Sequence, residues 1–294
     1  MLNLHHVRLF AAAAEHGNVS AAAARLRLSQ PALSKQVQEL EAALGVRLLE
    51  RLPRGVRPTA AGELLAGYAR QIGALAEEAE GALADLRGLR RGRLRLGASM
   101  TIGVYLLPRL VAGARQRWPG LDIDCEIGNT DAVQRGLVER RLDLGLVEGP
   151  GPREEQLASR TFQRDAMIVV ASPALRPWPR SLAQLAAAPW VMREPGSGTR
   201  AVAERALARL GVRLHPAWTF NNPEAIQQAV LAGLGVALMP QVAVASALAE
   251  GRLRQVPVPG LTLRRPLRAQ WLRPRPLTPA AAAFLASLHP AAGA

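Results

Sequence analysis

Residues 91–294 alternate short apolar runs with helical patterns, and this alternation constrains the fold more than any other feature of the chain. Runs such as RLRLGAS (93–99) and LDLGLVEG (142–149) are typical of strands, and segments with apolar residues three and four apart lie between such runs. Strand–helix–strand repetition predicts a parallel sheet that binds ligands at the carboxyl ends of its strands. The pattern recurs over WVM, WTF and GVALM between residues 190 and 239, so we expect an α/β domain of two similar lobes with a cleft between them.

The segment LDIDCEI alternates apolar and polar residues, which predicts a strand with Cys125 facing inward as a small core residue. Cys125 is the only cysteine, so it cannot form an internal disulfide and has no companion for a metal cluster. We therefore expect a reducing, cytoplasmic setting, with no metal and no cofactor.

A long helix is predicted over 59–90, opened by Thr59. A seam of apolar residues three and four apart runs along it without a break, which is typical of a coiled-coil partner. Its charge is net acidic, 5 against 3, which argues against contact with DNA. The alternative is a helix packed on its own domain, but nothing N-terminal is large enough to cover it. We interpret the segment as a dimerisation helix, with a seam of Leu65, Tyr68, Ile72, Leu75, Ala79, Ala82, Leu86 and Leu89.

Residues 1–58 contain three short helical patterns, of which the third is the most informative. Ser20 is predicted to cap the second helix, and Ser29 precedes the third, QPALSKQVQELEAALG, which Gly45 ends. One face of this third helix is an apolar stripe, and the opposite face carries short polar groups and one cation, as a major groove accepts. The stripe consists of Leu33, Val37, Leu40 and Leu44, and the opposite face of Pro31, Ser34, Lys35 and Gln38.

The segment LLERLPRGVRPT after this helix is suited to a basic wing that straddles phosphates, because Arg51, Arg54 and Arg57 surround Pro53 and Gly55. The alternative is a three-helix packing unit followed by an ordinary solvated loop. Periodicity alone does not decide between the two.

The net charge of +14 suggests nucleic acid or anionic ligands as partners. However, 36 of the 37 basic residues are arginines in an alanine-rich chain, which is typical of a GC-rich coding bias. The charge is also spread out: residues 1–58 carry 8 basic and 4 acidic groups, and residues 91–294 carry 26 and 14. Charge alone therefore does not locate a DNA surface.

Neither a membrane span nor a signal peptide is expected. Residues 225–249 contain no charge, but glutamines, glycines and a proline interrupt them, so a helix, a short buried strand and a second helix explain the run better than a span. The N-terminus is a weak match to a signal peptide because Arg8 and Glu15 break its apolar run.

The segment SAAAARLRLSQPALSKQVQELEAALGVRLLER, followed by GVRPTAAG, closely resembles the winged helix-turn-helix of LysR-type transcriptional regulators. The resemblance covers the whole chain. It implies a DNA-binding domain at 1–58, a linker or dimerisation helix at 59–90 and a two-lobed effector-binding domain at 91–294, similar to type 2 periplasmic binding proteins. Lobe one would comprise about 91–163 and 268–294, and lobe two about 164–267.

Two residues depart from the family's pattern: Leu49, where Phe is common, and Pro58, where Leu is common. Both concern the packing of the wing and leave the groove-facing residues intact. By resemblance, the partners are double-stranded operator DNA, a small effector and further copies of the chain in a homodimer or homotetramer, and RNA polymerase is left open as another partner. The expected DNA contacts are Ser29, Gln30, Pro31, Ser34, Lys35, Gln38, Arg51, Arg54 and Thr59.

The second domain also resembles one branch of the family. The stretches LGASMTIGVYLLP, GNT (128–130), LGLVEG (144–149) and REPGSGTR (193–200) are similar to regulators of sulfite-reduction and Calvin-cycle genes. The resemblance implies a cleft lined by Ser99, Met100, Thr101, Asn129, Thr130, Glu148, Arg193, Ser197, Gly198 and Thr199.

Two of these stretches predict an anion site. Ser99–Thr101 ends a strand and opens a helix in lobe one, and Ser197–Thr199 does the same in lobe two. Their N–H groups and hydroxyls suit a small oxyanion, with sulfite the first candidate and a phosphorylated or carboxylate metabolite the alternative. Glu148 would repel a bare anion, so we expect it to pair with Arg193 or Arg200, or to accept from a ligand hydroxyl or ammonium. The alternative for REPGSGTR is a turn with a capped helix.

Other classes of function have less support. An enzyme is not expected, because Ser197 lies in PGSGT rather than G-x-S-x-G, and the adjacent His5 and His6 do not have the spacing of a helical metal pair. A solute-binding transport component is disfavoured by the missing signal peptide and by the extra N-terminal block. The sequence therefore predicts a transcription regulator, and it leaves open the operator, the effector and the direction of regulation.

Overall fold

The computed structural model describes residues 2–52, 55–85, 92–152, 154–258, 260–273 and 276–288. Within these ranges the chain forms two compact units, the first made mainly of residues 1–80 and the second of most of the remainder. The first unit is helical with one small hairpin, and the second contains a sheet of nine described strands.

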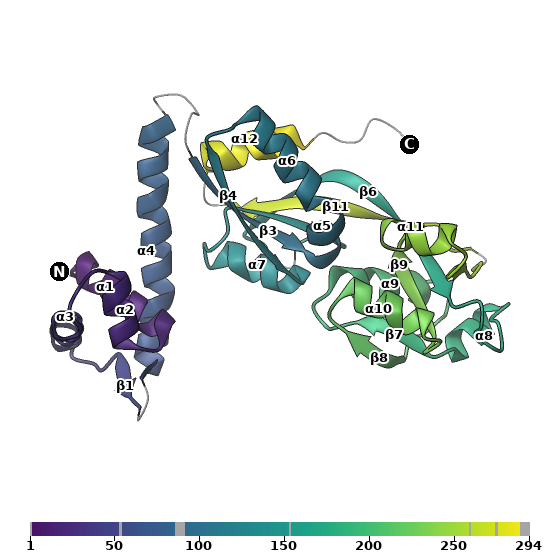
Figure 1. The fold of residues 1–294 in the computed structure, drawn as a ribbon, viewed down its shortest axis with the longest axis horizontal. Coiled ribbons are helices and arrows are strands. Elements are labelled where there is room, and N and C mark those ends of the chain that lie inside the picture. Colours follow the sequence, from purple (N-terminus) through teal and green to yellow (C-terminus); the bar gives the residue numbers. More distant parts are fainter. Residues whose placement is uncertain are drawn as a thin grey trace. The chain divides into compact units, whose positions relative to one another are not determined.

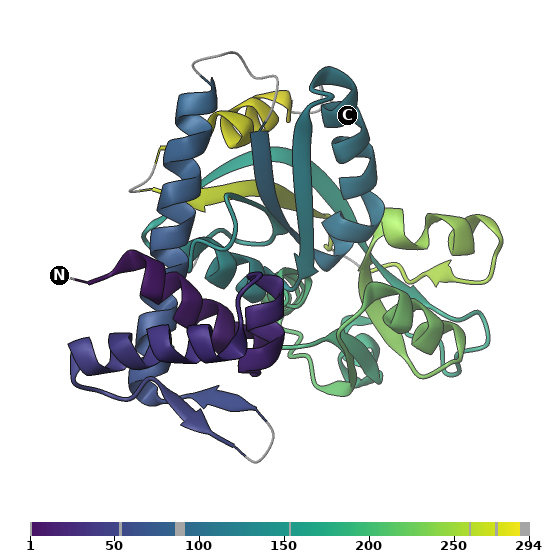
Figure 2. The same ribbon diagram turned by 60° about the vertical axis from the view of Figure 1, so that its left-hand side comes forward.

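The first unit is a winged helix-turn-helix, as predicted. Its elements before the long helix are α1 (Leu4–His16), α2 (Val19–Arg25), α3 (Gln30–Leu44), β1 (Leu49–Arg51) and β2 (Val56–Pro58). The three helices share one core that includes Phe10 and Leu33, and the antiparallel strands form the wing (Figure 2). Gly45 ends α3 in the left-handed conformation, as expected.

The N-cap of α2 is Asn18, which corrects the assignment of Ser20. Asn18 Oδ1 accepts hydrogen bonds from the backbone N–H groups of Ser20 (2.9 Å) and Ala21 (3.1 Å). Asn and Ser are about equally good caps, so residue type did not separate them. The extended backbone of Asn18 (φ −149°, ψ 116°) makes it the cap and leaves Ser20 inside the first turn.

A single helix, α4 (Ala60–Asp85), covers most of the segment for which a long helix was predicted, and Leu86 and Leu89 lie outside the described residues. Ala66 and Ala69 of α4 are buried in the core formed by α1–α3, and Leu65 packs against the same core. The expectation that nothing N-terminal could cover this helix is therefore wrong for its first turns.

The second unit is built on one sheet. Its strands are β3 (Gly92–Ser99), β4 (Leu121–Gly128), β5 (Leu144–Glu148), β6 (Leu157–Ala171), β7 (Trp190–Arg193), β8 (Pro216–Phe220), β9 (Val236–Pro240), β10 (Arg254–Gln255) and β11 (Leu263–Leu272). Their order in the sheet is β4-β3-β5-β11-β6-β9-β7-β8, and β10 pairs with β6.

The sheet is mixed, which corrects the prediction of a parallel sheet. Strand β3 pairs in parallel with β4 and β5, and β7 with β8 and β9, as expected for two α/β lobes. The long strands β6 and β11 were not predicted; they are antiparallel to each other and join the two parallel sets (Figure 1). The predicted lobe boundaries, 163/164 and 267/268, fall inside these two strands, and the register of β11 shifts between Leu267 and Arg268.

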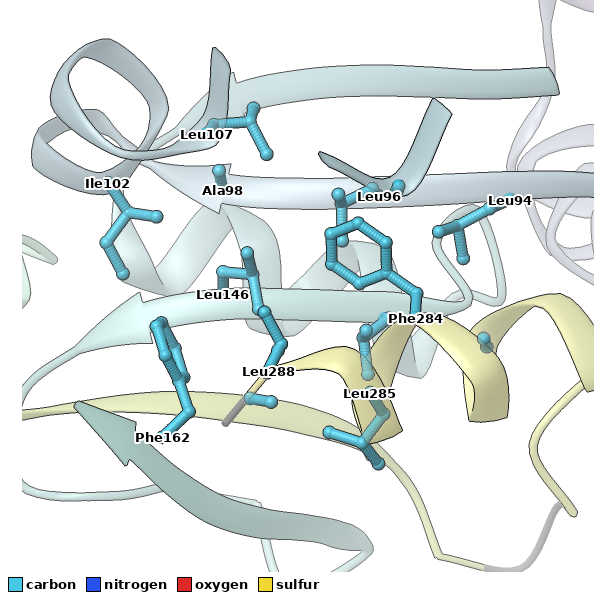
Figure 3. Packing of buried hydrophobic residues seen from close by; sticks show 14 of the residues in the cluster. Leu94, Leu96, Ala98, Ile102, Leu107, Leu146, Phe162, Phe284, Leu285 and Leu288 are labelled. Carbon is cyan, nitrogen blue, oxygen red and sulfur yellow. The ribbon is translucent and has the colours of Figure 1, made fainter. Parts of the chain in front are cut away.

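We use lobe one for β3–β5 with their helices and lobe two for β7–β9 with theirs. The helices of lobe one are α5 (Met100–Tyr105), α6 (Leu107–Arg117), α7 (Thr130–Val138) and α12 (Pro279–Ser287). Those of lobe two are α8 (Leu182–Ala187), α9 (Gly198–Ala208), α10 (Pro223–Leu231) and α11 (Gln241–Ala249). In lobe one, Phe284 of α12 and Leu96 of β3 lie in one fully buried cluster (Figure 3), so the C-terminal helix completes a core begun almost 200 residues earlier.

Cys125 is exposed, which corrects its assignment to the core. It lies on β4, which has a neighbour on one side only because β4 is the outermost strand of the sheet. Ile127 on the same strand is also 45% exposed. Alternation predicted the strand correctly, but it could not tell an edge strand from a central one.

The uncharged run 225–249 lies almost wholly within α10, β9 and α11, as predicted. All five residues of β9 are buried. No helix among the described residues is long and apolar enough to cross a membrane.

Candidate functional site

Helix α3 presents the predicted groove-facing residues on one side. Ser29 caps the helix by accepting a hydrogen bond from the backbone N–H of Ala32 (3.3 Å). Of the predicted apolar stripe, Leu33, Val37 and Leu40 are buried in the core, whereas Leu44 is 40% exposed. Gln30 Nε2 donates to Ser34 Oγ (3.0 Å), and Lys35 Nζ lies 3.9 Å from Glu39 Oε1. Ser29, Gln30, Pro31, Lys35 and Gln38 are exposed and Ser34 is half-buried, so this face has the polar donors that base edges require.

The structure describes only some of the predicted basic residues of the wing. Arg51 is the last residue of β1, and Arg54 lies outside the described residues. Arg57 on β2 forms an exposed ion pair with Glu50 on β1 at 2.8 Å.

Thr59 was expected to contact DNA, but its hydroxyl is engaged within the protein. It donates to the carbonyl of Arg47 (2.7 Å) and accepts from the N–H of Gly62 (3.0 Å). Thr59 therefore caps α4, as the sequence also predicted, and ties its start to the chain before the wing.

Among the seam residues whose burial the structure describes, only those at the start of α4 pack against the first unit's core. Leu65 packs on the first unit's core, whereas Tyr68 and Leu75 are 55% and 54% exposed. Ile72 is half-buried and Ala79 is exposed. Large apolar side chains repeated along one exposed helix face are what a partner helix buries.

At the junction of the two lobes, two of the hydroxyls predicted to bind an oxyanion donate hydrogen bonds to the carboxylate of Glu148. Ser99, at the end of β3, donates from Oγ to Glu148 Oε2, and Thr199, on α9, donates from Oγ1 to Glu148 Oε1 at 3.0 Å. Glu148 ends β5 and is only 1% exposed. The carboxylate thus links lobe one to lobe two.

Arg265 on β11 completes this cluster, and sequence reasoning missed it. Its Nη1 donates to Thr199 Oγ1 (2.7 Å) and lies 3.7 Å from Glu148 Oε1. Its Nε and Nη2 donate to Asp165 Oδ2 on β6, at 3.0 and 2.8 Å. Arg265, Leu267 and Ala269 alternate as buried residues of β11, and this period-two pattern was the available signal. We refer to Ser99, Glu148, Asp165, Thr199 and Arg265 as the junction cluster.

The expected pairing of Glu148 with Arg193 or Arg200 is therefore wrong. Arg193 pairs with Glu194 (2.8 Å) and Arg200 with Glu204 (2.7 Å), so neither neutralises Glu148. Burial raises the pKa of Asp165, the Arg265 guanidinium opposes this shift, and the negative charge of Glu148 adds to it. One arginine thus faces two carboxylates.

The glycines of REPGSGTR allow this loop of lobe two to pack closely against lobe one. A Cβ on Gly198 would lie 2.0 Å from the carbonyl oxygen of Glu148 and 2.6 Å from Thr130 Oγ1. Thr130 Oγ1 accepts from the N–H of Gly198 (3.1 Å), and the N–H of Asp131 donates to the carbonyl of Gly196 (3.2 Å). The loop lies too close to lobe one for any larger residue at position 198.

Three other predicted residues have local roles. Ser197 caps α9, since its Oγ accepts from the N–H of Arg200 at 3.5 Å, the limit of a hydrogen bond. Asn129 Oδ1 accepts from the N–H of Ala132 (2.9 Å) and caps α7. Met100 is the first residue of α5 and is half-buried. The capped-turn interpretation of REPGSGTR is therefore correct as far as Ser197 is concerned.

A hollow beside the junction cluster has polar groups without partners. It encloses about 410 Å³ of empty space, partly open to solvent, and its walls come mainly from β7, β9, α9 and α10. Thr101 and Arg193, both predicted cleft residues, line it and are 1% and 3% exposed. Thr101 Oγ1 and Arg193 Nη1 have no hydrogen-bond partner among the described residues. Buried polar atoms without partners are rare and often mark a place that a ligand or water fills.

No group of three or more His, Cys, Asp or Glu side chains among the described residues could hold a metal ion. The described histidines are scattered, and His6 lies 3.7 Å from Glu39. The functional groups described at the lobe junction are hydrogen-bond donors and charged side chains.

Two family models together match nearly the whole chain. The model "LysR substrate binding domain" matches residues 87–293, and the model "Bacterial regulatory helix-turn-helix protein, lysR family" matches residues 4–63. The RuBisCO operon transcriptional regulator of Allochromatium vinosum is 35% identical over 286 residues, which cover 96% of this chain and 94% of that protein.

Solved structures show the same fold. The crystal structure of full-length CbnR complexed with its target DNA covers 97% of this chain and 98% of that chain, with a TM-score of 0.71 and 24% identity. The regulatory domain of CcmR from Synechocystis PCC6803, in complex with 2-PG, covers 67% of this chain and 96% of that chain, with a TM-score of 0.61 and 26% identity.

Proposed function

Because the chain belongs to the LysR family of bacterial transcriptional regulators, we propose that α3 and the wing bind operator DNA and that a small anionic effector binds at the junction of the lobes. Relatives such as the RuBisCO operon regulator support its place in the Calvin-cycle branch of the family. Helix α4 joins two copies of the chain, and the dimers assemble further into tetramers. A regulator of this kind acts on the chromosome, so its place is the cytoplasm, where RNA polymerase is a further partner.

The exposed face of α3 supports the assignment of the DNA contacts. Gln30 suits adenine and Lys35 suits guanine, because an amide pairs with the donor and acceptor of adenine and an ammonium with the two acceptors of guanine. Arg51 and Arg54 of the wing are assigned to phosphates, where they contribute affinity without sequence preference.

The observation that carries the effector proposal is the pair of unpartnered buried atoms in the hollow. Thr101 Oγ1 and Arg193 Nη1 offer a hydroxyl and a guanidinium N–H to an anion. Thr101 comes from lobe one and Arg193 from lobe two, so an anion held by both contacts both lobes. Such a ligand binds the two arrangements of the lobes unequally, and only unequal binding shifts their equilibrium.

Two kinds of anion are candidates. Sulfite is the first, from the branch of the family that the cleft stretches resemble. A phosphorylated metabolite is the second, because the related CcmR regulatory domain is known in complex with 2-PG.

A gel shift with the DNA upstream of the protein's own gene tests the DNA-binding assignment. We expect a complex that survives excess competitor DNA of unrelated sequence, because specific binding exceeds non-specific binding by about 10³-fold or more. Equal competition by the unrelated DNA would contradict it.

Thermal unfolding tests the effector site. With sulfite, sulfate, phosphate, 2-PG, sugar phosphates or O-acetylserine each added separately, a true effector at 100 times its Kd stabilises the protein by about 2.7 kcal/mol. Thr101→Val and Arg193→Gln should remove most of this gain, and Thr219→Val, an exposed control on β8, should keep it. If no compound stabilises the protein, or if all three variants respond alike, the site is assigned wrongly.

A further inference from the structure

The junction cluster is a complete oxyanion site that a side chain of the protein already fills. Two hydroxyls donate to the Glu148 carboxylate, that of Ser99 from lobe one and that of Thr199 from lobe two. The guanidinium of Arg265, on the strand between the lobes, lies 3.7 Å from the same carboxylate. Hydroxyls and a guanidinium are the donors that carboxylate and phosphate groups require. The Glu148 carboxylate accepts from both hydroxyls, and the three groups are each 5% exposed or less.

The charges around this site do not balance, because there are more carboxylates than cations, and packing alone does not require this imbalance. Arg265 is the cation that faces Glu148, and it is shared with Asp165, which takes two of its N–H groups at 3.0 and 2.8 Å. The carboxylates of buried Glu148 and half-buried Asp165 share one guanidinium and leave an excess negative charge, so a further anion brought beside them would be repelled. The negative charge of Glu148 therefore opposes the binding of an effector with an acidic group.

From these contacts we propose, building on the effector site proposed above, that Glu148 is a tethered stand-in for the effector's acidic group and determines which anions bind. In the effector-free protein Glu148 holds the two lobes together through Ser99 and Thr199. An anionic effector is held by the two unpartnered groups of the neighbouring hollow, and its acidic group takes the hydroxyls and Arg265 from Glu148.

The geometry favours displacement of Glu148 by the ligand over binding of the ligand beside Glu148. Thr199 belongs both to the junction cluster and to the lining of the hollow, so the two spaces meet at its side chain. Thr101, whose hydroxyl is unpartnered, follows Ser99 by two residues. A ligand in the hollow therefore reaches the hydroxyls of the cluster without crossing the core.

Removing the charge of Glu148 provides the test. Glu148→Gln keeps the shape and a hydrogen-bonding end but removes the negative charge, so inorganic phosphate and 2-PG should bind about tenfold more tightly, or more, than to the wild type. Isothermal titration calorimetry on the full chain measures both affinities. Weaker or unchanged binding by Glu148→Gln would overturn the proposal.

Asp165→Asn is the matched control. It removes a charge from the same guanidinium but leaves Ser99 and Thr199 bound to Glu148. We expect a clearly smaller gain in anion affinity than with Glu148→Gln. Equal gains would mean that general electrostatics acts and that Glu148 does not occupy the ligand's place.

A measurement on the wild type keeps the test independent of how the variants fold. Glu148 is 1% exposed, so carbodiimide labelling of its carboxyl should be slow and should accelerate when 2-PG displaces it. Protection of Glu148 by 2-PG would contradict the exchange. A third outcome separates the two proposals. If 2-PG binding depends on Thr101 and Arg193, but 2-PG leaves the labelling rate of Glu148 unchanged and Glu148→Gln binds 2-PG as the wild type does, the effector site is supported and the role of Glu148 is contradicted.

Discussion

The hydroxyl of Tyr105 on α5 donates a hydrogen bond of 2.7 Å to Glu224 Oε1 at the start of α10, and this bond joins lobe one to lobe two. Neither residue belongs to the junction cluster. Both side chains are partly buried, so the contact is less screened than a surface pair.

Tyr105→Phe and Glu224→Gln should each destabilise the second unit, and together by less than the sum of the two. We expect a coupling free energy of about 1 kcal/mol, because a hydrogen bond to a charged group is worth about 1.5–3 kcal/mol when fully buried and this one is only partly buried. Urea unfolding of the wild type, both single variants and the double variant measures it. Strict additivity would show that the bond contributes nothing to the joining of the lobes.

The same bond predicts a dependence of stability on alkaline pH. Burial raises the pKa of Tyr105, and the hydrogen bond and charge of Glu224 raise it further. The unfolded chain releases this proton near pH 10, whereas the folded protein retains it, so the free energy of unfolding falls as the pH rises above about 10. Tyr105→Phe should show a shallower fall over this range, and equal slopes would contradict the assignment.

On α3, Lys35→Ala should cost about 1–3 kcal/mol of binding free energy at the operator and much less on unrelated DNA. The structure leaves Lys35 exposed, with only a 3.9 Å contact to Glu39, so its removal should not unfold the helix. Arg51→Ala is the contrast: it should weaken all DNA sequences alike and lower the salt slope by about one. Wild-type operator affinity of Lys35→Ala would show that α3 does not enter the groove in this way.

On α4, Ile72→Glu combined with Leu75→Glu should dissociate the dimer, because pairing of the helices would bury two unpartnered charges. Sedimentation would then show a smaller species with reduced operator affinity. Arg70→Glu is the control, since Arg70 lies about 200° around the helix from Ile72 and is exposed. A dimer that persists in the double variant would place the subunit contact elsewhere.

Two glycines of the second unit should respond oppositely to alanine. Gly198→Ala places a Cβ 2.0 Å from the backbone oxygen of Glu148, so the loop or lobe one must shift, at a cost of about 1–3 kcal/mol or more in the free energy of unfolding. Gly113→Ala, inside α6 with nothing within 4 Å, should instead stabilise by up to about 1 kcal/mol. Denaturant unfolding of both variants checks the contrast, which fails if Gly198→Ala is neutral.

Much of the candidate site was accessible from sequence because its signals are local. Ser29 before α3, Ser197 before α9 and Gly45 after α3 have the residue types that helix ends require, and each has that role in the structure. Ser99, Thr199 and Glu148 were also named correctly as neighbours, but only through the family resemblance.

The partners of these residues were not accessible in the same way. Arg193 and Arg200 were the expected partners of Glu148 because they flank the loop in sequence, yet each pairs with a glutamate close by in the chain. Arg265 takes the place instead, because β11 is antiparallel to both β5 and β6 and thereby brings Arg265 between Glu148 and Asp165.

The sequence by itself determined the caps of α3 and α9, the parallel strands of each lobe, the apolar seam of α4 and the residue types at the lobe junction. These follow from interactions between residues a few positions apart, which periodicity and capping rules describe. Only the tertiary structure decided that Cys125 lies on an edge strand, that β6 and β11 join the lobes, and that Glu148 accepts hydrogen bonds from both Ser99 and Thr199. Each of these depends on which distant strands pair and in what register, and that choice is made by the packing of the whole sheet rather than by any local stretch.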